Sequence, residues 1–550
     1  MSSILKYPQS KTAFLFLSIL ALAVTAANGL PARAQDHAQA QPAPQPAPHA
    51  AAATFQNPIL WEDLADDDVI RVGDTYYYTA SNMHYSPGAP ILRSYDLVHW
   101  EYVGHALPVL DFGPAYDLDG GNAYIKGTWA SFLNYRKSNQ TFYWGGCIPG
   151  TGKTHIFTAP RAEGPWQRHA IIDNCYYDAG LLIDDDDTMY VAYGNTTLHV
   201  AQLSPDGTKE VRSEVVFHTP PEVQTLEGSR FYKVNGNYYI FTTRPPNGEF
   251  VLKSSTGPFG PYTMQKLVLD AVPPVPGAGS PHQGGIVQTQ KGDWYYMAFI
   301  DAYPGGRIPV LAPMHWNADG WPEMEIAGNT WGDSYPYPLP PHPLASNTGT
   351  DLFKGKTLGP QWEWNHNPDN AKWAVDNGLT LATATVTDDL YAARNTLTHR
   401  ILGPQSTATI EVDVSRMKDG DRAGLALLKH VSAWVGVKRD AGAYKIVMEN
   451  GLTMSVRGWV TTGKGTDVES APLAGKRLWL RASADIRPGP DRTASFSYST
   501  DGRTFKSIGA PFTLNTQWMF FMGYRFAIFN YATKELGGEV KVKSFAVTAP

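Results

Sequence analysis

Residues 182–194, LIDDDDTMYVAYG, contain the pattern that decides the fold: an apolar run, a polar turn, and a bulky pair that opens the next strand. The pattern recurs in RVGDTYYYTA (71–80), NYRKSNQTFYWGG (134–146), YKVNGNYYIFTT (232–243) and VQTQKGDWYYMAF (287–299). The bulky pairs begin at residues 76, 142, 189, 238 and 295, so they lie 47 to 66 residues apart. Antiparallel blades of a propeller recur at roughly 40 to 50 residues, so the five copies predict a five-bladed β-propeller.

The segments between the repeats also indicate an all-β chain. From Val69 to about Phe299, short runs rich in Tyr, Phe, Val and Ile alternate with Gly, Asn, Asp or Pro turns, and no long stretch has helical periodicity. A Pro-rich connector, YPYPLPPHPL (335–344), then separates this part from the rest. We therefore assign residues 54–340 to the propeller.

Residues 350–550 carry a second set of predicted strands. Segments such as ATIEVDV (408–414), AWVGVKR (433–439) and YKIVMEN (444–450) alternate apolar and polar residues. This alternation predicts an antiparallel β-sandwich. The acids of the propeller repeat have no counterpart there, so the chemistry is expected in the propeller.

The N-terminus has the features of a secretory signal peptide. Two lysines precede an apolar run over residues 12–27, and an A-x-A cleavage signature follows at residues 32–34. We predict a signal peptide over residues 1–34 and an exported protein, periplasmic or secreted. The alternative, an uncleaved membrane anchor, needs roughly 20 apolar residues, which is more than this run offers. Residues 35–53, rich in Ala, Gln and Pro, are predicted to form a linker.

The chain has two cysteines, Cys147 and Cys175. Disulfides persist in exported proteins, so a bridge between them is one interpretation. Two separately buried thiols are the other, because the sequence does not report how far apart the two residues lie.

Charge and composition exclude several kinds of partner. The net charge is −6 and the Lys and Arg residues are scattered, so the basic surface of a nucleic-acid-binding protein is missing. After signal cleavage no remaining stretch is apolar enough to span a membrane. Aromatic residues make up 12% of the chain, which suits stacking on sugar rings and equally suits all-β cores. A neutral substrate fits this composition best.

The repeat assigns five side chains to equivalent positions. Counting 10 to 13 residues back from each bulky pair gives Asp66, Trp129, Asp178, Glu227 and His282. Equivalent positions of a propeller repeat lie at equivalent places around the axis, so these side chains are expected to converge at one mouth of the central channel. The alternative interpretation, for each acid taken singly, is a solvated residue in a turn. The shared offset favours a site, where burial beside like charges shifts pKa values.

Three acids at one mouth suit the hydrolysis of a glycosidic bond. That reaction needs a protonated carboxyl group that donates to the leaving oxygen and an ionised carboxylate at the anomeric side. Carboxylates on the first and fourth of five blades face each other across the channel with room for water, so inversion of configuration is expected. A third acid, Asp178, close to Glu227 would raise the pKa of the general acid by like-charge repulsion.

Six long segments carry a family resemblance. They are NPILWEDLADDDVIRVGDTYYYTAS (57–81), SPGAPILRSYDLVHWEYVGHAL (86–107), YDAGLLIDDDDTMYVAYG (177–194), LEGSRFYKVNGNYYIF (226–241), PHQGGIVQ (281–288) and GRIPVLAPMHWNADGWP (306–322). In this order they resemble glycoside hydrolase family 43, which includes β-xylosidases, α-L-arabinofuranosidases and arabinanases on five-bladed propellers. The resemblance implies that Asp66 is the general base, Asp178 the pKa modulator and Glu227 the general acid. Family members usually have Pro after the base, whereas Asp67 follows here, which leaves Asp68 as an alternative base.

The resemblance implies roles for three further residues. Trp129 is expected to line the sugar-binding subsite, and Arg307 to reach substrate hydroxyls through its fork of donors. The alternatives are core packing for Trp129 and a surface salt bridge for Arg307. His282 matches a family histidine near the axis that often accompanies a calcium ion, and its alternative is a simple hydrogen bond. No cofactor is expected to be required, and a structural calcium ion there would take most of its ligands from water.

The C-terminal part resembles the concanavalin-like sandwich that follows many β-xylosidase propellers of this family. The resemblance is carried by WEWNHNPDN (362–370), AGLALLKHVSAWVGVKR (423–439) and GYRFAIFNYA (523–532). Such a domain commonly packs against the catalytic mouth and narrows it. This favours exo-acting cleavage of chain ends.

The sequence therefore predicts an inverting exo-glycosidase that hydrolyses terminal pentose residues of plant hemicellulose, with β-1,4-xylosidase ahead of α-L-arabinofuranosidase or arabinanase. The expected substrates are fragments of xylan, arabinoxylan or arabinan. A hypothesis from another class is an inactive carbohydrate-binding propeller, which would be expected to have lost at least one of the three acids. Esterase and zinc-protease chemistry find no support, because the G-x-S-x-G and H-E-x-x-H motifs are absent.

Overall fold

The computed structural model describes residues 53–549, and within this range the chain is built from strands and loops without an α-helix. The signal peptide and nearly all of the linker lie outside the described residues and stay predictions. Four short 3-10 turns occur: η1 (Pro114–Asp117), η2 (Asn370–Lys372), η3 (Leu390–Ala392) and η4 (Trp518–Phe520). Over the same residues no helix has the length and apolar character needed to cross a membrane.

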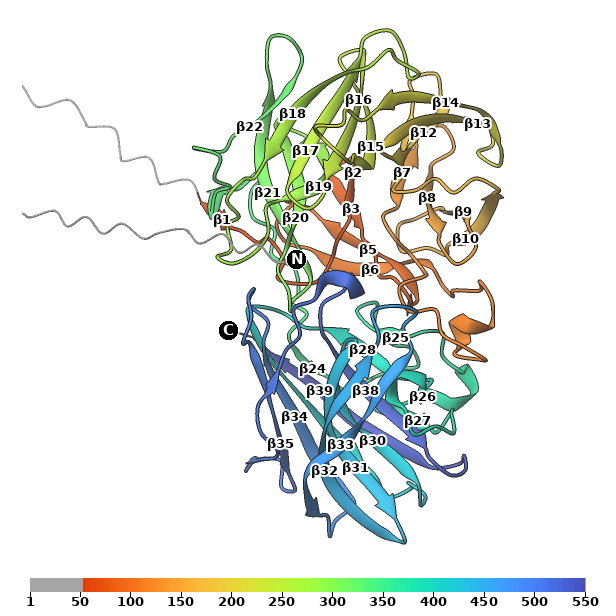
Figure 1. Ribbon diagram of the computed structural model, residues 1–550, viewed down its shortest axis with the longest axis vertical. Coiled ribbons are helices and arrows are strands. Elements are labelled where there is room, and N and C mark those ends of the chain that lie inside the picture. The colour runs from red at the N-terminus through yellow and green to blue at the C-terminus, as the bar shows by residue number, and fades with distance from the viewer. Residues whose placement is uncertain (1–52, 550) are drawn as a thin grey trace, which may run out of the picture. The chain divides into compact units, whose positions relative to one another are not determined.

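Five four-stranded antiparallel sheets form the first domain (Figure 1). The first blade contains β2 (Asp68–Val72), β3 (Thr75–Thr79), β5 (Gly88–Ser94) and β6 (Glu101–Leu107), and the second contains β7 (Phe132–Arg136), β8 (Thr141–Ile148), β9 (Lys153–Ala159) and β10 (Gln167–Ile172). The third blade contains β11 (Gly180–Ile183), β12 (Met189–Asn195), β13 (Thr197–Leu203) and β14 (Glu210–His218), and the fourth contains β15 (Glu227–Val234), β16 (Asn237–Arg244), β17 (Gly248–Ser254) and β18 (Thr263–Leu269). The fifth blade contains β19 (His282–Gln288), β20 (Trp294–Asp301), β21 (Arg307–Trp316) and β22 (Pro322–Met324). The first strands of the blades contact one another in a closed ring, β2 to β7, β11, β15, β19 and back to β2. The predicted five-bladed propeller is confirmed.

The repeated pattern forms the hairpin between the first two strands of each blade. In the fourth blade Val234 pairs with Asn237, so Asn235 and Gly236 form a two-residue turn. Both turn residues have positive φ, 50° and 79°, which is the conformation that an Asn-Gly hairpin turn requires. The bulky pair then opens the second strand, and at least one of its members is buried in every blade, as Tyr239 is here.

Two large antiparallel sheets form the second domain (Figure 1). One sheet contains β26 (Trp373–Val375), β27 (Leu379–Ala382), β39 (Glu539–Thr548), β29 (Gln405–Asp413), β34 (Arg477–Asp485), β35 (Thr493–Ser499), β36 (Lys506–Ser507), β24 (Gly349–Asp351) and β37 (Phe512–Thr513); the other contains β33 (Thr461–Pro472), β32 (Ala443–Met454), β31 (Val431–Asp440), β30 (Asp421–Leu428), β38 (Arg525–Ala532), β28 (Leu397–Arg400) and β25 (Glu363–Asn365), with β4 (Tyr85–Ser86) at its edge. Leu480 of the first sheet and Leu425 and Phe526 of the second belong to one fully buried cluster. The predicted β-sandwich is confirmed.

A strand from the propeller belongs to the sandwich. β4 lies in the connection between β3 and β5 of the first blade, and Ser86 pairs with Trp364 of β25. Beside this strand a buried carboxylate, Glu363, accepts hydrogen bonds from Arg400 Nη1 (2.9 Å) and Arg525 Nη1. Burial opposes ionisation of Glu363, yet the two guanidinium groups hold its pKa well below the usual range. His105 of β6 lies within hydrogen-bonding distance of the same carboxylate (Nε2 to Oε1, 3.0 Å), so this contact and the strand pairing join the two domains at the first blade.

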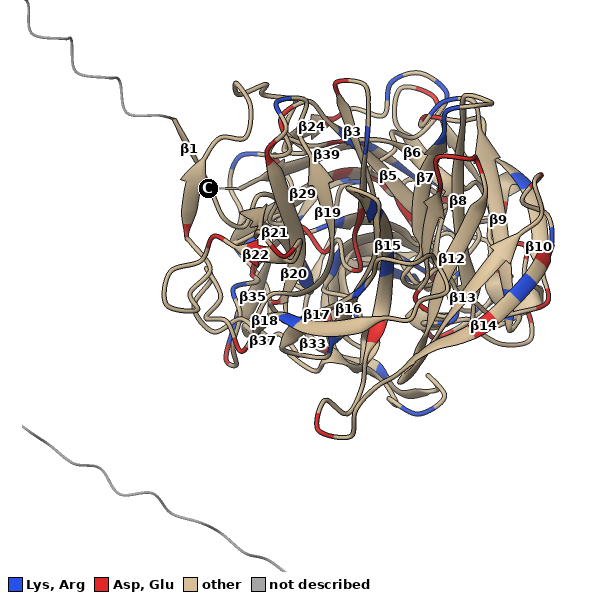
Figure 2. Cartoon of the chain, turned by 90° about the horizontal axis from the view of Figure 1, so that it is seen from above, with Lys and Arg blue, Asp and Glu red and all other residues tan. Residues whose placement is uncertain are grey.

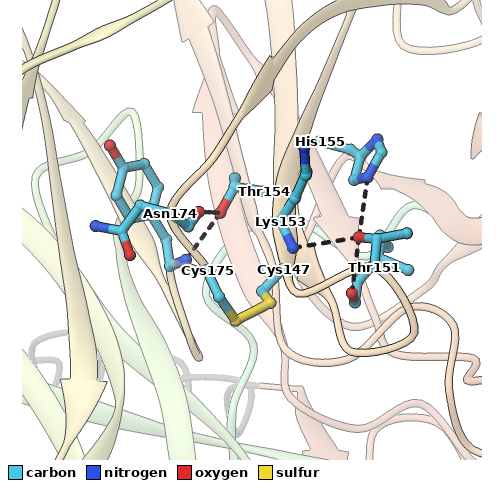
Figure 3. The surroundings of a disulfide bond; sticks show 9 residues. Cys147, Thr151, Lys153, Thr154, His155, Asn174 and Cys175 are labelled. Carbon is cyan, nitrogen blue, oxygen red and sulfur yellow. Dashed lines mark hydrogen bonds between the residues drawn. A yellow bond between two sulfur atoms is a disulfide. The ribbon is translucent and has the colours of Figure 1, made fainter.

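The two cysteines form a disulfide bond between β8 and the segment that leads into β11 (Figure 3). Thr154 Oγ1 donates to the Asn174 carbonyl oxygen (2.7 Å) and accepts from the Tyr176 N–H (2.8 Å) beside it. The segment before Asp178 is therefore fixed to the second blade by covalent and hydrogen bonds.

Acidic and basic residues are interspersed over the described chain. In the view of Figure 2, Lys and Arg positions are scattered among Asp and Glu positions. This distribution agrees with the scattered charges expected from the sequence.

Candidate active site

The five residues at equivalent repeat positions lie at the start of the innermost strand of each blade. Asp66 and Asp178 precede β2 and β11 by two residues, Trp129 precedes β7 by three, and Glu227 and His282 are the first residues of β15 and β19. Because these strands form a ring, their starts surround one mouth of the central channel. We call this end the catalytic mouth.

The backbone turns sharply where two of the acids enter the mouth. Asp66 has φ 58° and Asp178 has φ 49°, the left-handed region that residues other than glycine adopt rarely. Gly228, directly after Glu227, has φ 68°. Such conformations cluster at functional sites, where the surrounding structure must hold them.

Asp66 is paired with a buried arginine. Arg307 Nη1 donates to Asp66 Oδ1 (2.8 Å) and Nη2 donates to Oδ2 (3.2 Å), and Ser81 Oγ also donates to Oδ2. The exposed fractions of the Arg307 and Asp66 side chains are 10% and 5%, so this pair is not the surface salt bridge that was the alternative for Arg307. A carboxylate that accepts two hydrogen bonds from one guanidinium group is fixed in orientation.

The other two acids lie in surroundings that favour their protonated forms. Burial raises the pKa of Glu227, and the charge of Asp66 raises it further, while donation from Tyr177 Oη (3.4 Å) and Asn195 Nδ2 lowers it. Burial also raises the pKa of Asp178 well above its usual value, with added repulsion from Glu227 and Asp66. The mouth therefore combines one cation-paired carboxylate with two acids that resist ionisation, the arrangement that acid-base hydrolysis needs.

A buried arginine joins the three blades that carry the acids. Arg230 of β15 donates from Nη2 to the Asp66 carbonyl oxygen (2.7 Å), from Nε to that of Asp67 (2.9 Å) and from Nη1 to that of Ala179 (2.9 Å). Its own strand begins at Glu227. One side chain thus fixes the backbone beside all three acids.

The acids after Asp66 have different surroundings. Asp68 Oδ2 accepts the Leu133 N–H (2.8 Å) of the second blade, so this carboxylate is engaged in joining blades. Asp67, which stands where family members usually have Pro, is fully buried, and neither carboxylate oxygen has a hydrogen-bond partner among the described residues. Burial raises the pKa of Asp67 well above its usual value. The pairing with Arg307 supports Asp66 rather than Asp68 as the base.

Trp129 belongs to an aromatic group at the mouth. Its Nε1 donates to the Ile125 carbonyl oxygen (2.6 Å), and its ring lies 6.2 Å from Tyr177 and 5.5 Å from Phe521, between ring centroids. Phe521 follows η4 of the sandwich (Figure 1, blue turn), and the Arg307 guanidinium carbon lies 5.7 Å from its ring. The second domain therefore contributes an aromatic side chain to the catalytic mouth.

His282 is buried beside the mouth. Its Nδ1 lies 2.9 Å from the Ser280 carbonyl oxygen, and its ring packs against Phe299. Burial lowers the pKa of His282, which favours the neutral imidazole. Among residues 53–549 no group of three or more His, Cys, Asp or Glu side chains is arranged to hold a metal ion. A calcium ion at His282 would depend on water for most of its ligands, and no chemical step is assigned to it.

Two family descriptions match the chain in succession. Residues 55–322 match glycosyl hydrolases family 43, and residues 350–548 match the beta xylosidase C-terminal Concanavalin A-like domain. The beta-xylosidase of Formosa agariphila is 30% identical over 90% of this chain and 90% of its own length. The chain belongs to glycoside hydrolase family 43. It is accordingly a glycoside hydrolase.

Other similar members of family 43 carry different activities in their names. A non-reducing end alpha-L-arabinofuranosidase of Bacteroides ovatus is 32% identical over 59% of this chain and 64% of its own length. A solved structure of a family 43 enzyme, engineered at its active site to display both endo-xylanase and exo-arabinofuranosidase activity, is 48% identical. The alignment covers 91% of this chain and 100% of that chain, with a TM-score of 0.88.

Sequence reasoning missed several residues of this family 43 site. Tyr177 is adjacent to a predicted acid, and Arg230 lies three residues after another, so proximity was the only signal for both. Asn195 ends a strand and carries no motif. Phe521 lies in the other domain, and no pattern along the chain connects it to the propeller.

Proposed function

We propose that this family 43 enzyme is an inverting exo-glycosidase that releases terminal pentose residues from xylan-type polysaccharides. In this proposal Asp66 is the general base, Glu227 the general acid and Asp178 the modulator of its pKa. The observation that carries the proposal is the contrast between Asp66, paired with Arg307, and Glu227, whose pKa is raised mainly by burial. A carboxylate held in place by a cation and a second acid that resists ionisation are what the reaction requires.

The steps of the reaction follow from the roles proposed for Asp66 and Glu227. Asp66 accepts a proton from a water molecule, whose oxygen forms a bond to the anomeric carbon. The bond from that carbon to the glycosidic oxygen breaks, and Glu227 gives its proton to the leaving oxygen. One water molecule is consumed, and the configuration at the anomeric carbon inverts. Burial favours the protonated form of Glu227, and Arg307 holds the Asp66 carboxylate in its orientation.

Two pentoses are candidates for the released sugar. The name of the Formosa agariphila relative, a beta-xylosidase with 30% identity over 90% of this chain, supports β-linked xylose, and we propose the β-1,4 linkage. The 48% identity to the engineered enzyme with exo-arabinofuranosidase activity favours α-L-arabinofuranose as the second candidate. Single contacts that discriminate similar sugars contribute about 1 to 3 kcal/mol each, so both pentosides must be tested.

The aromatic contribution of the second domain supports exo action. Phe521 approaches both Trp129 and Arg307, and we infer that it narrows the mouth on the side of the sandwich. A narrowed mouth accepts a chain end more readily than the interior of a polymer. Fragments of xylan, arabinoxylan or arabinan are the substrates that we propose.

The test compares hydrolysis of nitrophenyl β-D-xyloside and nitrophenyl α-L-arabinofuranoside by the wild-type enzyme, Asp66→Ala and Glu227→Ala, with NMR of the released anomer. We expect the inverted anomer from the wild type and a loss of about 10² to 10⁴ in kcat for Asp66→Ala. The preferred substrate identifies the sugar. Retention of configuration would refute the mechanism, and an undiminished Asp66→Ala would refute the base.

We further propose that the protein is exported, to the periplasm or the medium, after cleavage behind residue 34. The support is the lysine-flanked apolar run with its A-x-A signature. N-terminal sequencing of the protein recovered from the periplasm and the medium of expressing cells tests this. A chain that keeps residues 1–34 and stays with the membrane would contradict it.

A further inference from the structure

The segment between β37 and β38, residues 514–524, lies where the sandwich approaches the propeller. It contains η4 and the exposed Trp518 as well as Phe521, and we call it the aromatic loop. We propose that Asp63 is a positioning residue that couples the sandwich to catalysis by holding this loop against the strand of Arg307. The inference rests on the proposed function, because hydrolysis at the same mouth is one of its readouts.

A single carboxylate bridges the two domains. Asp63 is 4% exposed, its Oδ1 accepts the backbone N–H of Arg307 (2.8 Å), and its Oδ2 accepts the backbone N–H of Gly523 (3.0 Å). The adjacent Leu64 N–H donates to the Arg307 carbonyl oxygen (2.9 Å). Asp63 is therefore fixed to the strand that presents Arg307 to Asp66, and through its second oxygen to the aromatic loop.

The loop and the propeller meet backbone to backbone at this point. A Cβ atom added to Gly523 would lie 2.2 Å from the Gly305 carbonyl oxygen, and one added to Gly306 would lie 2.1 Å from Asp63 Oδ1. These distances leave no room for a side chain between the two domains. A small displacement of the carboxylate would consequently be transmitted to the loop.

The aromatic loop is also tied to its own domain. Lys429, fully buried after β30, donates from Nζ to the carbonyl oxygens of Asn515 (3.0 Å) and Gln517 (2.9 Å). The sandwich therefore holds the loop through Lys429. The hydrogen bond between Asp63 and Gly523 then sets the position of Phe521 relative to Arg307.

Substitution Asp63→Asn tests this link with little change in volume. The amide nitrogen replaces one carboxylate oxygen. One of the two backbone N–H groups that donated to the carboxylate then faces a donor instead of an acceptor. A matched control is Asp96→Asn. Asp96 is fully buried in the first blade and accepts the N–H groups of Val98 (2.9 Å) and His342 (2.7 Å), without contact to the catalytic mouth.

The experiment measures kcat and KM of the full chain on nitrophenyl pentosides for Asp63→Asn, Asp96→Asn, Phe521→Ala and the double variant Asp63→Asn/Phe521→Ala. We expect Asp63→Asn to lower kcat/KM by about 10- to 100-fold, because small misplacements at an active site have effects of this size. Asp96→Asn should stay within about threefold of the wild type, like other substitutions away from the site. The double variant should lose much less than the product of the single losses, because both act through the same loop.

Amide hydrogen exchange of residues 514–524 provides a readout that does not depend on turnover. Exchange in the loop should become about tenfold faster in Asp63→Asn and stay unchanged in Asp96→Asn, since only the former removes a contact of the loop. Unchanged exchange, or single losses that multiply in the double variant, would overturn the coupling. If exchange becomes faster in Asp63→Asn as expected but the wild type hydrolyses no pentoside, the coupling stands and the proposed function is refuted.

Discussion

Arg307→Lys tests whether the buried pair with Asp66 supports catalysis. The guanidinium donates two hydrogen bonds to Asp66, of 2.8 and 3.2 Å, whereas a lysine ammonium is a point charge that keeps one at most. A hydrogen bond to a charged group contributes about 1.5 to 3 kcal/mol, and about 1.4 kcal/mol corresponds to a factor of ten in rate, so kcat/KM should fall about 10- to 150-fold.

Steady-state kinetics on the preferred nitrophenyl pentoside provide the assay, with Arg136→Lys as a matched control. The Arg136 side chain is also 10% exposed and donates from Nε and Nη2 to Asp187, which is 38% exposed and lies away from the mouth. The control should keep its kcat/KM within about threefold of the wild type, as expected for a substitution away from the site. A comparable loss in both variants, or almost none in Arg307→Lys, would show that the pair with Asp66 does not act in catalysis.

Three further changes have defined outcomes. Burial is the main cause of the raised pKa of Glu227, and Asn195 lowers that pKa by donating to the carboxylate. Asn195→Ala should therefore raise the pKa of Glu227 further and move the alkaline limb of the pH–kcat profile to higher pH. A limb that moves to lower pH would contradict the assignment of Glu227 as the general acid. The double variant Cys147→Ala/Cys175→Ala opens a 28-residue loop and should lower the free energy of unfolding by about 3 to 4 kcal/mol, measured in urea, and an unchanged midpoint would refute this. Trp129→Ala should raise KM about three- to tenfold with little change in kcat, and an unchanged KM would exclude Trp129 from the sugar subsite.

Local patterns were sufficient for the fold because each blade is built from contacts close in sequence. The Asn235-Gly236 turn, with positive φ at both residues, sets the register of the hairpin that it closes. An offset of 10 to 13 residues from each bulky pair therefore reaches the start of each innermost strand, where Asp178 and Glu227 lie. The alternation of β29, whose inward residues are buried, similarly identified a sandwich strand.

The sequence by itself determined five blades, a sandwich, and three acids at equivalent strand starts, because these features repeat over distances that one hairpin spans. Only the tertiary structure decided which groups the acids meet. Arg307 reaches Asp66 across 241 residues when the propeller closes, and Gly523 of the sandwich reaches Asp63 across 460. The Cys147–Cys175 bond likewise depends on how two segments pack. Such contacts follow from ring closure and domain packing, which leave no period or spacing along the chain.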